Sequence, residues 1–423
     1  MRVIIIGAGI GGLTLALSLH AAGMEAVVYE ATPEIRALGV GINVLPHAVR
    51  ELTELGLADS LSQKSVAPET LMYANKFGQE IWREPRGRAA GYNWPQYSIH
   101  RGGLQMLLLE TVRERLGPNS VHTGHEAIGV ETRGGKSIVT FRGRSGPAPA
   151  PAEGDVVVAA DGIHSALRAS FYPEEGAPIW NRRVLWRGVT EAEPFLDGRT
   201  MIMAGHQDVK FVCYPIDPSV ETRGAALINW IAELRFPDEA VWRREDWNRR
   251  GDPADFLPRF EDWTFPWLDV PGLIKRTDVI YEYPLVDRDP VDRWTFGRTT
   301  LLGDAAHPMY PIGSNGASQA ILDARTLAYR LATSADIDTA LQDYEGERRP
   351  ATNRLVLVNR GNGPEQVMQL AEERAPKGFN HVNDVLSRQE LEDVANNYKR
   401  LAGFDREALN ARPSLTPLQQ AVS

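Results

Sequence analysis

Short apolar runs alternate with amphipathic stretches over the first 60 residues. Residues 3–6 and 25–29 are β-branched, apolar runs that predict two strands. The stretch between them is typical of a helix and ends at Gly23, a residue that suits a helix C-terminus. Strand, glycine-rich turn, helix and strand form a βαβ unit. This unit argues against a signal peptide or membrane anchor over the uncharged residues 3–24, so we expect a chain without an export signal.

The pattern then changes twice along the chain. Helical periodicity predicts helices over residues 46–55, 102–116, 315–332 and 336–359, and apolar runs predict strands over 97–99, 155–160 and 299–302. Between about 180 and 290, five short β-rich runs are separated by turns rich in Pro, Asp and Gly, which predicts an antiparallel sheet. The last 60 residues are polar, with a helical signal over 385–401.

These patterns predict an α/β chain (α+β overall) made of two interleaved domains and a tail. A Rossmann-like nucleotide-binding domain takes residues 1–70, 97–178 and 287–360. A mostly antiparallel β-sheet domain takes 71–96 and 179–286 and covers it, and 361–423 forms a helical C-terminal segment.

Charge and cysteine content narrow the function. The 423 residues include 46 Lys and Arg against 55 Asp and Glu, a net charge of −9, which disfavours nucleic-acid binding through phosphate neutralisation. The single cysteine, Cys213, excludes intrachain disulfides and is consistent with a cytoplasmic location, where thiols stay reduced. Nine histidines without metal-ligand spacing predict that the chain holds no metal.

The turn after the first strand carries a dinucleotide fingerprint. Gly7, Gly9 and Gly12 have the Gly-x-Gly-x-x-Gly spacing, and Glu30 ends the next strand. The glycines let the backbone approach a pyrophosphate at the helix N-terminus, and the acid can accept hydrogen bonds from a ribose. The motif predicts FAD or NAD rather than NADP at this place.

Two carboxylates follow later apolar strands. Asp161 opens Asp-Gly-Ile-His-Ser, and Asp304 stands in Gly-Asp-Ala-Ala-His-Pro. A carboxylate at the carboxyl end of a strand points into the ligand crevice of an α/β sheet, and Asp304 suits a polyol such as a ribityl chain. The loop through Pro311 and Gly313 to Asn315 can hold a planar ring before the next helix, whose positive end would stabilise a reduced flavin.

The three motifs together resemble the single-component FAD-dependent aromatic hydroxylases of the para-hydroxybenzoate hydroxylase type, over about residues 1–360. Residues 39–43, 97–101, 186–190 and 309–317 resemble most the bacterial phenazine-carboxylate hydroxylases of pyocyanin formation. The resemblance implies that FAD is the cofactor and that NADH or NADPH visits as a transient reductant. It also implies that O2 forms a flavin C4a-hydroperoxide, which hydroxylates a planar aromatic or N-heteroaromatic substrate.

The resemblance also implies roles for individual residues. Glu30 would bind the adenosine ribose, while Arg36 and Arg101 would lie near the pyrophosphate and the ribityl chain. Asp161 would serve FAD and the nicotinamide cofactor, and Asp304 the ribityl hydroxyls. The isoalloxazine would be bordered by Pro311, Gly313, Ser314 and Asn315.

Candidates for the substrate pocket come from the apolar and aromatic positions of the middle sheet and of the loop before it. These candidates are Ile42, Trp186, Tyr214 and Trp230. Arg187 and Arg243 are candidates for pairing with a substrate carboxylate. His307 is a candidate general acid or base, or a residue that shapes its loop.

Several alternatives remain open on the same fold. An FAD oxidase or dehydrogenase would not insert oxygen, whereas a Baeyer–Villiger or N-hydroxylating enzyme would use the same peroxide. A flavoprotein that sequesters an aromatic ligand would bind without turnover. We expect a small aromatic substrate and O2 as partners, with no nucleic acid or membrane, in a monomer or homodimer.

Overall fold

The computed structural model describes residues 1–143, 147–241 and 248–417. Its first sheet has six strands in the order β20-β21-β12-β1-β2-β8. Their bounds are β1 (Arg2–Ile6), β2 (Glu25–Tyr29), β8 (Val121–His122), β12 (Val156–Ala159), β20 (Thr295–Phe296) and β21 (Thr299–Leu301). β1 pairs in parallel with β2 and β12, and β12 with β21. β1 and β12 are almost wholly buried because both faces of this sheet are covered.

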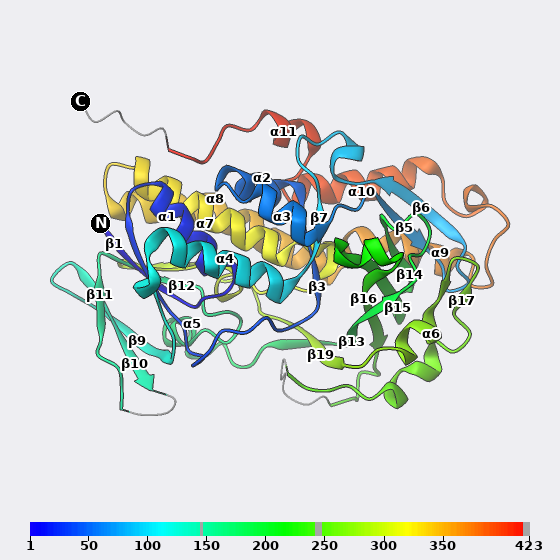
Figure 1. Ribbon diagram of the computed structural model, residues 1–423, viewed down its shortest axis with the longest axis horizontal. Helices are drawn as coiled ribbons and strands as arrows, with labels where there is room; N and C mark the ends of the chain where they lie inside the picture. The colour runs from blue at the N-terminus through cyan, green and yellow to red at the C-terminus, as the bar shows by residue number, and fades with distance from the viewer. Residues whose placement is uncertain (144–146, 242–247, 418–423) are drawn as a thin grey trace.

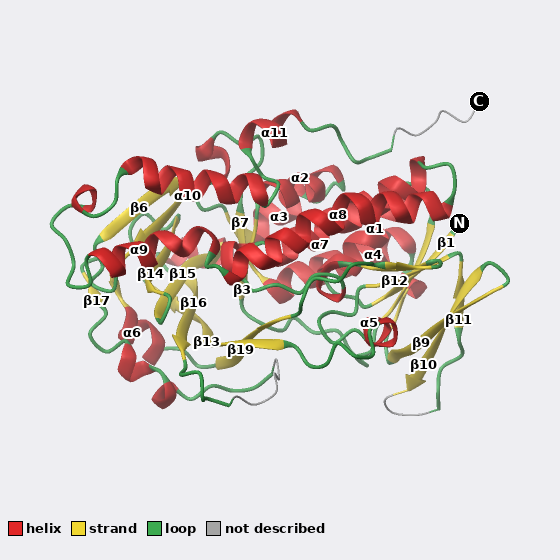
Figure 2. Ribbon diagram, turned by 180° about the vertical axis from the view of Figure 1, so that it is seen from behind, coloured by secondary structure: helices red, strands yellow, loops and turns green. Residues whose placement is uncertain are grey.

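Helices cover one face of the six-stranded sheet, and a small sheet covers the other. The helices of this part are α1 (Ile10–Ala21), α2 (Pro46–Glu54), α3 (Ala58–Lys64), α4 (Arg101–Leu116), α5 (Ala166–Phe171), α7 (Gly316–Thr333) and α8 (Ile337–Arg360). α1 packs against both α4 and α7, which explains why it is apolar around most of its circumference. The long helices α7 and α8 run side by side across the molecule (Figure 1 and Figure 2).

The second large sheet has seven strands in the order β19-β13-β16-β15-β14-β5-β6. Their bounds are β5 (Thr70–Ala74), β6 (Glu80–Pro85), β13 (Ile179–Ala192), β14 (Thr200–His206), β15 (Val209–Asp217), β16 (Ala226–Arg235) and β19 (Ile280–Asp287). Neighbouring strands are antiparallel except β14 and β5, which are parallel. The predicted fold class is confirmed, and we propose that the two large sheets mark the two predicted domains.

The two faces of the seven-stranded sheet have different partners. The far face carries Trp186 and Trp230 and is covered by Phe256, Phe260 and helix α6 (Val270–Lys275). The near face carries Leu185 and other side chains that pack toward the nucleotide-binding part of the chain. A ligand bound between the two large sheets would therefore contact this near face.

Smaller sheets join these parts. A three-stranded sheet of β3 (Gly41–Val44), β7 (Tyr97–His100) and β4 (Ser65–Val66) lies between the two large sheets. Another is made of β9 (His125–Arg133), β10 (Lys136–Gly143) and β11 (Ala152–Gly154), and a hairpin of β17 (Thr264–Phe265) and β18 (Leu268–Asp269) completes the set. The sequence analysis did not identify β3 or the β9–β11 sheet.

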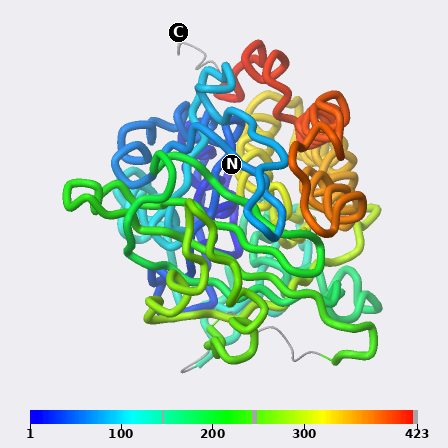
Figure 3. Tube along the Cα trace, turned by 90° about the vertical axis from the view of Figure 1, so that its right-hand side faces the viewer, coloured from blue at the N-terminus to red at the C-terminus, as the bar shows by residue number. Residues whose placement is uncertain are grey.

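The C-terminal segment is helical, as predicted, and packs on both large parts of the molecule. It contains α9 (Gln366–Arg374), α10 (Arg388–Leu401) and α11 (Arg406–Ala411). α9 contacts β14 and β6, whereas α10 contacts α8. Figure 3 shows this orange and red segment beside the yellow residues of α7 and α8. None of the helices in the described ranges combines the length and the apolar character that a membrane crossing requires.

Candidate active site

The glycine-rich turn between β1 and α1 is shaped by two glycines and left open at a third. A Cβ on Gly7, whose φ is +105°, would lie 2.4 Å from the carbonyl oxygen of Ala160. A Cβ on Gly12 would lie 2.1 Å from the carbonyl oxygen of Gly7. A Cβ on Gly9 would meet no described atom within 4 Å. Gly7 and Gly12 therefore allow the turn to pack, and Gly9 leaves room for a ligand at the N-terminus of α1.

Glu30 is tied to this turn. Its carboxylate accepts hydrogen bonds from the backbone N–H of Ala8, at 2.8 Å, and of Thr32, at 2.9 Å. From α4, Gln105 Nε2 donates to the carbonyl oxygen of Ala8, at 2.8 Å. Gln105 was not identified from the sequence because its role depends on the packing of α4 against the turn.

Asp161 stands beside the turn at the end of β12. Its Oδ2 accepts from the backbone N–H of Ala166 at 3.0 Å, and its buried Oδ1 has no hydrogen-bond partner among the described residues. Burial raises the pKa of Asp161 to about 6, although the Ser165 hydroxyl and backbone amides oppose this shift. A buried carboxylate oxygen without a partner is suited to a hydroxyl group of a ligand.

Arg168 joins the second motif to the third. Its side chain is 1% exposed and donates to the backbone carbonyls of Ala305, at 3.0 Å, and Ala306, at 2.8 Å. Its guanidinium pairs with Glu175, which also pairs with Arg288 at 3.1 Å. Arg168 lies seven residues after Asp161 in the chain, but its contact with the Asp304 segment depends on tertiary packing.

Asp304 is the exposed residue in an otherwise buried run, 303–308. Desolvation by the surrounding protein raises the pKa of this carboxyl group, and the nearby charges of His307 and Arg101 act in the opposite direction. Arg101 and Asp304 are thus near enough to interact electrostatically, and their roles at one cofactor stay predictions. Arg36 instead lies in an exposed loop and pairs with Glu34 at 2.5 Å.

The His307 side chain is buried and pairs with Asp323. Its ring is 1% exposed, and Nε2 lies 2.5 Å from Asp323 Oδ2. Arg348 also pairs with Asp323, at 2.7 Å, and the charges of His307 and Arg348 outweigh burial and lower the pKa of Asp323 to about 2. This placement favours the loop-shaping interpretation of His307 over acid–base catalysis.

The loop 311–315 ends on the N-terminus of α7. Gly313 and Ser314 both have left-handed backbone conformations, with φ of 67° and 58°. This conformation is unfavourable for serine, so the surrounding structure must hold it. The Asn315 side chain donates to Gly313 O and to the Tyr398 hydroxyl instead of capping α7, so among the described residues no side chain caps the first N–H groups of that helix.

Three near-face side chains converge on Gly41. Arg187 Nη2 and the Tyr214 hydroxyl donate to its carbonyl oxygen at 2.7 and 3.0 Å, and Asn229 Oδ1 accepts from its N–H at 2.7 Å. Burial raises the pKa of Tyr214 to about 12, so its hydroxyl stays a hydrogen-bond donor. Arg187 Nε and Asn229 Nδ2 are buried donors without a partner among the described residues.

Aromatic and apolar side chains extend this surface. Tyr281 lies beside Arg187 in the sheet register and its ring stacks on Tyr283, with the centroids 6.1 Å apart. Arg250 lies over the ring of Tyr281 at 4.9 Å. One row further, a cluster joins the sheet to the loop before α7; it consists of Leu185, Leu285, Tyr310 and Ile312. The near face therefore offers flat aromatic surface and positive charge beside the loop 311–315.

Only one of the four predicted pocket residues lies on this surface. Tyr214 does, but Trp186 and Trp230 are fully buried on the far face, where Trp186 stacks on Phe256 with the centroids 4.9 Å apart. This is a correction: β13 and β16 turn the two tryptophans into a closed core. Ile42 packs against the core of the six-stranded sheet. Arg243 lies outside the described residues.

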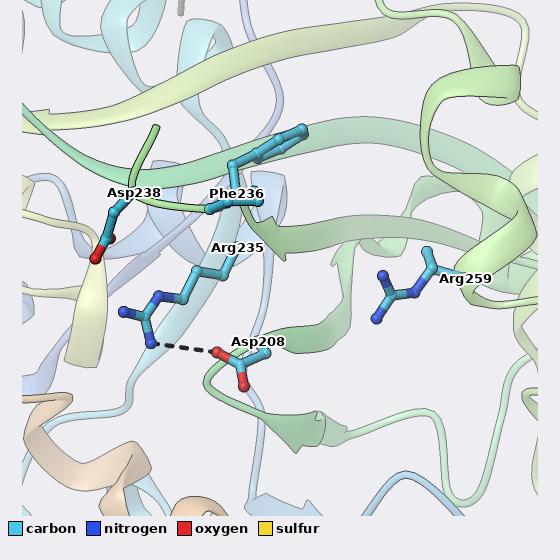
Figure 4. Close-up of a pocket in the computed structure, with 6 residues that line it drawn as sticks. Asp208, Arg235, Phe236, Asp238 and Arg259 are labelled. Carbon is cyan, nitrogen blue, oxygen red and sulfur yellow. Dashed lines mark hydrogen bonds and ion pairs between the residues drawn. The ribbon is translucent and has the colours of Figure 1, made fainter. Parts of the chain in front are cut away.

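A surface depression of about 410 Å³ lies elsewhere, at the turn between β14 and β15 (Figure 4). Its lining is mostly charged, and Arg235 pairs with Asp208 at 3.4 Å, while Arg259 reaches in from a separate segment. The six residues that line it include no predicted site residue. Open, charged side chains of this kind suit solvent rather than a planar apolar ligand.

The residues present fit FAD. The open turn at Gly9 leaves room for a pyrophosphate. Among the described residues, the unpartnered Asp161 Oδ1 and the exposed Asp304 suit ligand hydroxyls, and the uncapped N-terminus of α7 suits a flavin ring. In the part of the chain that the structure describes, no three His, Cys, Asp or Glu side chains gather to hold a metal ion.

Comparison with known proteins agrees with this geometry. A family described as an FAD binding domain matches residues 1–194 and 285–358. The chain is 48% identical over 361 residues to the phenazine 1,6-dicarboxylic acid hydroxylase of Lysobacter antibioticus. The aligned region covers 85% of this chain and 89% of that protein. It is 29% identical to 3-hydroxybenzoate 6-hydroxylase 1 of Aquipseudomonas alcaligenes, covering 85% of this chain and 88% of that protein.

A solved structure shares the fold. The crystal structure of Klebsiella pneumoniae HpxO with FAD and uric acid superposes with a TM-score of 0.74 at 24% identity and covers 96% of each chain. At this identity the likeness concerns the fold alone.

Proposed function

This chain belongs to the FAD binding domain family and is an FAD-dependent aromatic monooxygenase that uses NAD(P)H as its reductant, and we propose that its substrate is a planar N-heteroaromatic carboxylate of the phenazine type. The name of the Lysobacter relative supports this substrate class. The flat aromatic and positively charged near face supports it independently of that relative.

The reaction takes NAD(P)H, a proton, O2 and an aromatic C–H to NAD(P)⁺, a phenol and water. FAD, when bound, would supply the redox chemistry between NAD(P)H and O2. The chain has to hold the aromatic carbon at the flavin and to exclude water. The apolar contacts of Leu185 and Leu285 with Ile312 are suited to that exclusion.

The observation that carries the substrate proposal is the environment of Arg187. Its Nη2 binds Gly41, its buried Nε has no partner among the described residues, and Tyr281 and Tyr283 lie beside it. A guanidinium binds a carboxylate through two N–H groups, and the tyrosine rings offer a stacking surface for a planar ring system. We therefore propose Arg187 as the partner of the substrate carboxylate.

A substrate screen tests the proposed function. Purified FAD-loaded protein is supplied with NADH or NADPH and with phenazine, quinoline or pyridine carboxylates. We expect a phenazine carboxylate to accelerate NAD(P)H oxidation and to yield a product that carries one oxygen atom from ¹⁸O2. Accelerated oxidation that yields only hydrogen peroxide would instead support the oxidase alternative.

Substitution of Arg187 tests the carboxylate contact. Arg187→Gln removes the charge, so we expect KM for the carboxylate substrate to rise about 30- to 300-fold, which corresponds to about 2–3.4 kcal/mol. The matching carboxamide serves as an internal control, because its KM should change little. Arg223→Gln removes an exposed arginine, 60% of whose side chain is accessible, and should leave both values unchanged. Equal losses for carboxylate and carboxamide would contradict the proposed contact.

A cytoplasmic location and a monomeric or homodimeric state stay predictions. Light scattering of the purified protein at micromolar concentration would test the second of these.

A further inference from the structure

The C-terminal helix α10 reaches the loop that precedes α7, although it lies outside the residues that the family matches. A Cβ built on Gly313 would lie 2.0 Å from the hydroxyl oxygen of Tyr398 and 2.3 Å from Cζ of the same ring. Tyr398 is 4% exposed. The tyrosine thus occupies the space directly behind the turn at Gly313.

The Tyr398 hydroxyl is bonded on several sides. It accepts from Asn315 Nδ2 at 3.0 Å, and it lies 3.1 Å from both the carbonyl oxygen of Ile312 and Asn359 Oδ1, to one of which it donates. Asn359 Nδ2 in turn donates to the carbonyl oxygen of Tyr310, at 3.2 Å. A single side chain of the C-terminal segment therefore connects both ends of the loop 310–315.

These bonds act on a backbone that needs support. Ser314 has a left-handed conformation that a serine adopts only when its surroundings impose it. The network continues from Asn315 to Gln319 at 3.2 Å, and from Gln319 to Arg348 at 2.6 Å. Because these groups are buried, a missing partner would leave a polar atom unsatisfied rather than solvated.

We propose that Tyr398 is a positioning residue for the flavin: it holds the loop 310–315 in the shape that receives the isoalloxazine ring, and the C-terminal segment is thereby a working part of the cofactor site. The proposal rests on the proposed placement of that ring against Pro311–Asn315. It does not depend on which aromatic compound the enzyme hydroxylates.

Tyr398→Phe tests the proposal, because it keeps the ring and removes the hydroxyl. The full-length protein is stripped of FAD and titrated with FAD, and its thermal unfolding is followed without the cofactor. Tyr92→Phe is the matched control: the Tyr92 hydroxyl donates to the carbonyl oxygen of Phe404 at 2.7 Å, so it anchors the same C-terminal segment through a residue outside the loop 310–315.

We expect Tyr398→Phe to weaken FAD binding about tenfold, to shift the flavin absorption bands and to lower Tm. Tyr92→Phe should lower Tm by a similar amount and leave FAD affinity and absorption unchanged. A purely structural role would move only Tm in both variants, and equal FAD affinity in the two variants would overturn the proposal.

Asn359→Ala gives a second, independent test that decides the matter if Tyr398→Phe does not fold. It removes one acceptor of the same hydroxyl and the bond to Tyr310, so FAD binding should weaken at least threefold, and unchanged affinity would overturn the proposal. Neither measurement uses an aromatic substrate. Normal FAD affinities with no hydroxylated product would therefore contradict the proposed reaction and leave this inference standing.

Discussion

Asp161 shows how a single buried carboxyl group can reveal a ligand site. In the folded protein its pKa is raised to about 6 from an ordinary value of 3.8, because burial penalises the ionised form. Between these values the folded protein holds a proton that the unfolded chain has released. The contribution of Asp161 to the free energy of unfolding of the FAD-free protein therefore falls as the pH rises from about 4 to about 6.

Asp161→Asn removes this titration. We expect the variant to gain stability relative to the wild type as the pH rises through that window, by at most about 3 kcal/mol. Denaturant unfolding of both FAD-free proteins at several pH values between about 4 and 7 would measure the difference. A difference that does not change with pH would show that Asp161 has an ordinary pKa.

On the near face of the seven-stranded sheet, the sequence alone could not show which single side chains face the ligand. Val184, Leu185 and Trp186 are all buried, because both faces of β13 are covered. Without polar alternation, the sequence does not tell which residues face the flavin. The two tryptophans were therefore placed wrongly, whereas the register places Arg187 and Tyr281 side by side on the near face.

The turn between β1 and α1 allows packing and ligand approach to be tested separately. Gly12→Ala would place a Cβ 2.1 Å from the carbonyl oxygen of Gly7, so we expect a loss of about 1–3 kcal/mol of stability without FAD.

Gly9→Ala meets no described atom within 4 Å and should leave the apoprotein within about 0.5 kcal/mol of the wild type. It should nevertheless weaken FAD binding about tenfold, because the new methyl group occupies the approach to the helix N-terminus. Thermal melts and FAD titrations would separate the two effects, and normal FAD affinity in Gly9→Ala would contradict the placement of the pyrophosphate.

Regular elements with strong local signals were predicted closely. The strand predicted over 25–29 is β2, and the helix predicted over 102–116 is α4 with one further residue at its start. The motifs after β1, β12 and β21 were found because glycine and aspartate at strand ends are local signals. β3 was missed because its four residues gain their strand conformation from pairing with β7, a contact that is distant in sequence.

Buried ion pairs join the C-terminal segment to the seven-stranded sheet. Lys210 of β15 pairs with Glu365, just before α9, at 2.5 Å, and with Glu233 at 2.9 Å, and all three are less than 10% exposed. Buried ions without partners are costly, so this network fixes the C-terminal segment on the seven-stranded sheet. The sequence analysis did not identify this network, because charged residues in a polar tail are usually solvated.

Lys210→Met should therefore leave two acidic groups buried together. We expect a loss of about 3–5 kcal/mol in the free energy of unfolding. Arg388→Met breaks an exposed pair with Glu392 in the same segment and should cost less than about 0.5 kcal/mol. Urea unfolding of the three proteins would measure both changes, and similar small losses would mean that Lys210 is not held in a buried network.

The strand order of the six-stranded sheet has a consequence for how the protein is made. β12 lies between β1, from the first residues of the chain, and β21, near residue 300. A ribosome must therefore synthesise the whole seven-stranded sheet before the first sheet can receive its last parallel strand. Until then, the side of β12 that faces away from β1 has no partner strand. We therefore expect that a nascent chain paused before residue 299 does not yet retain its flavin.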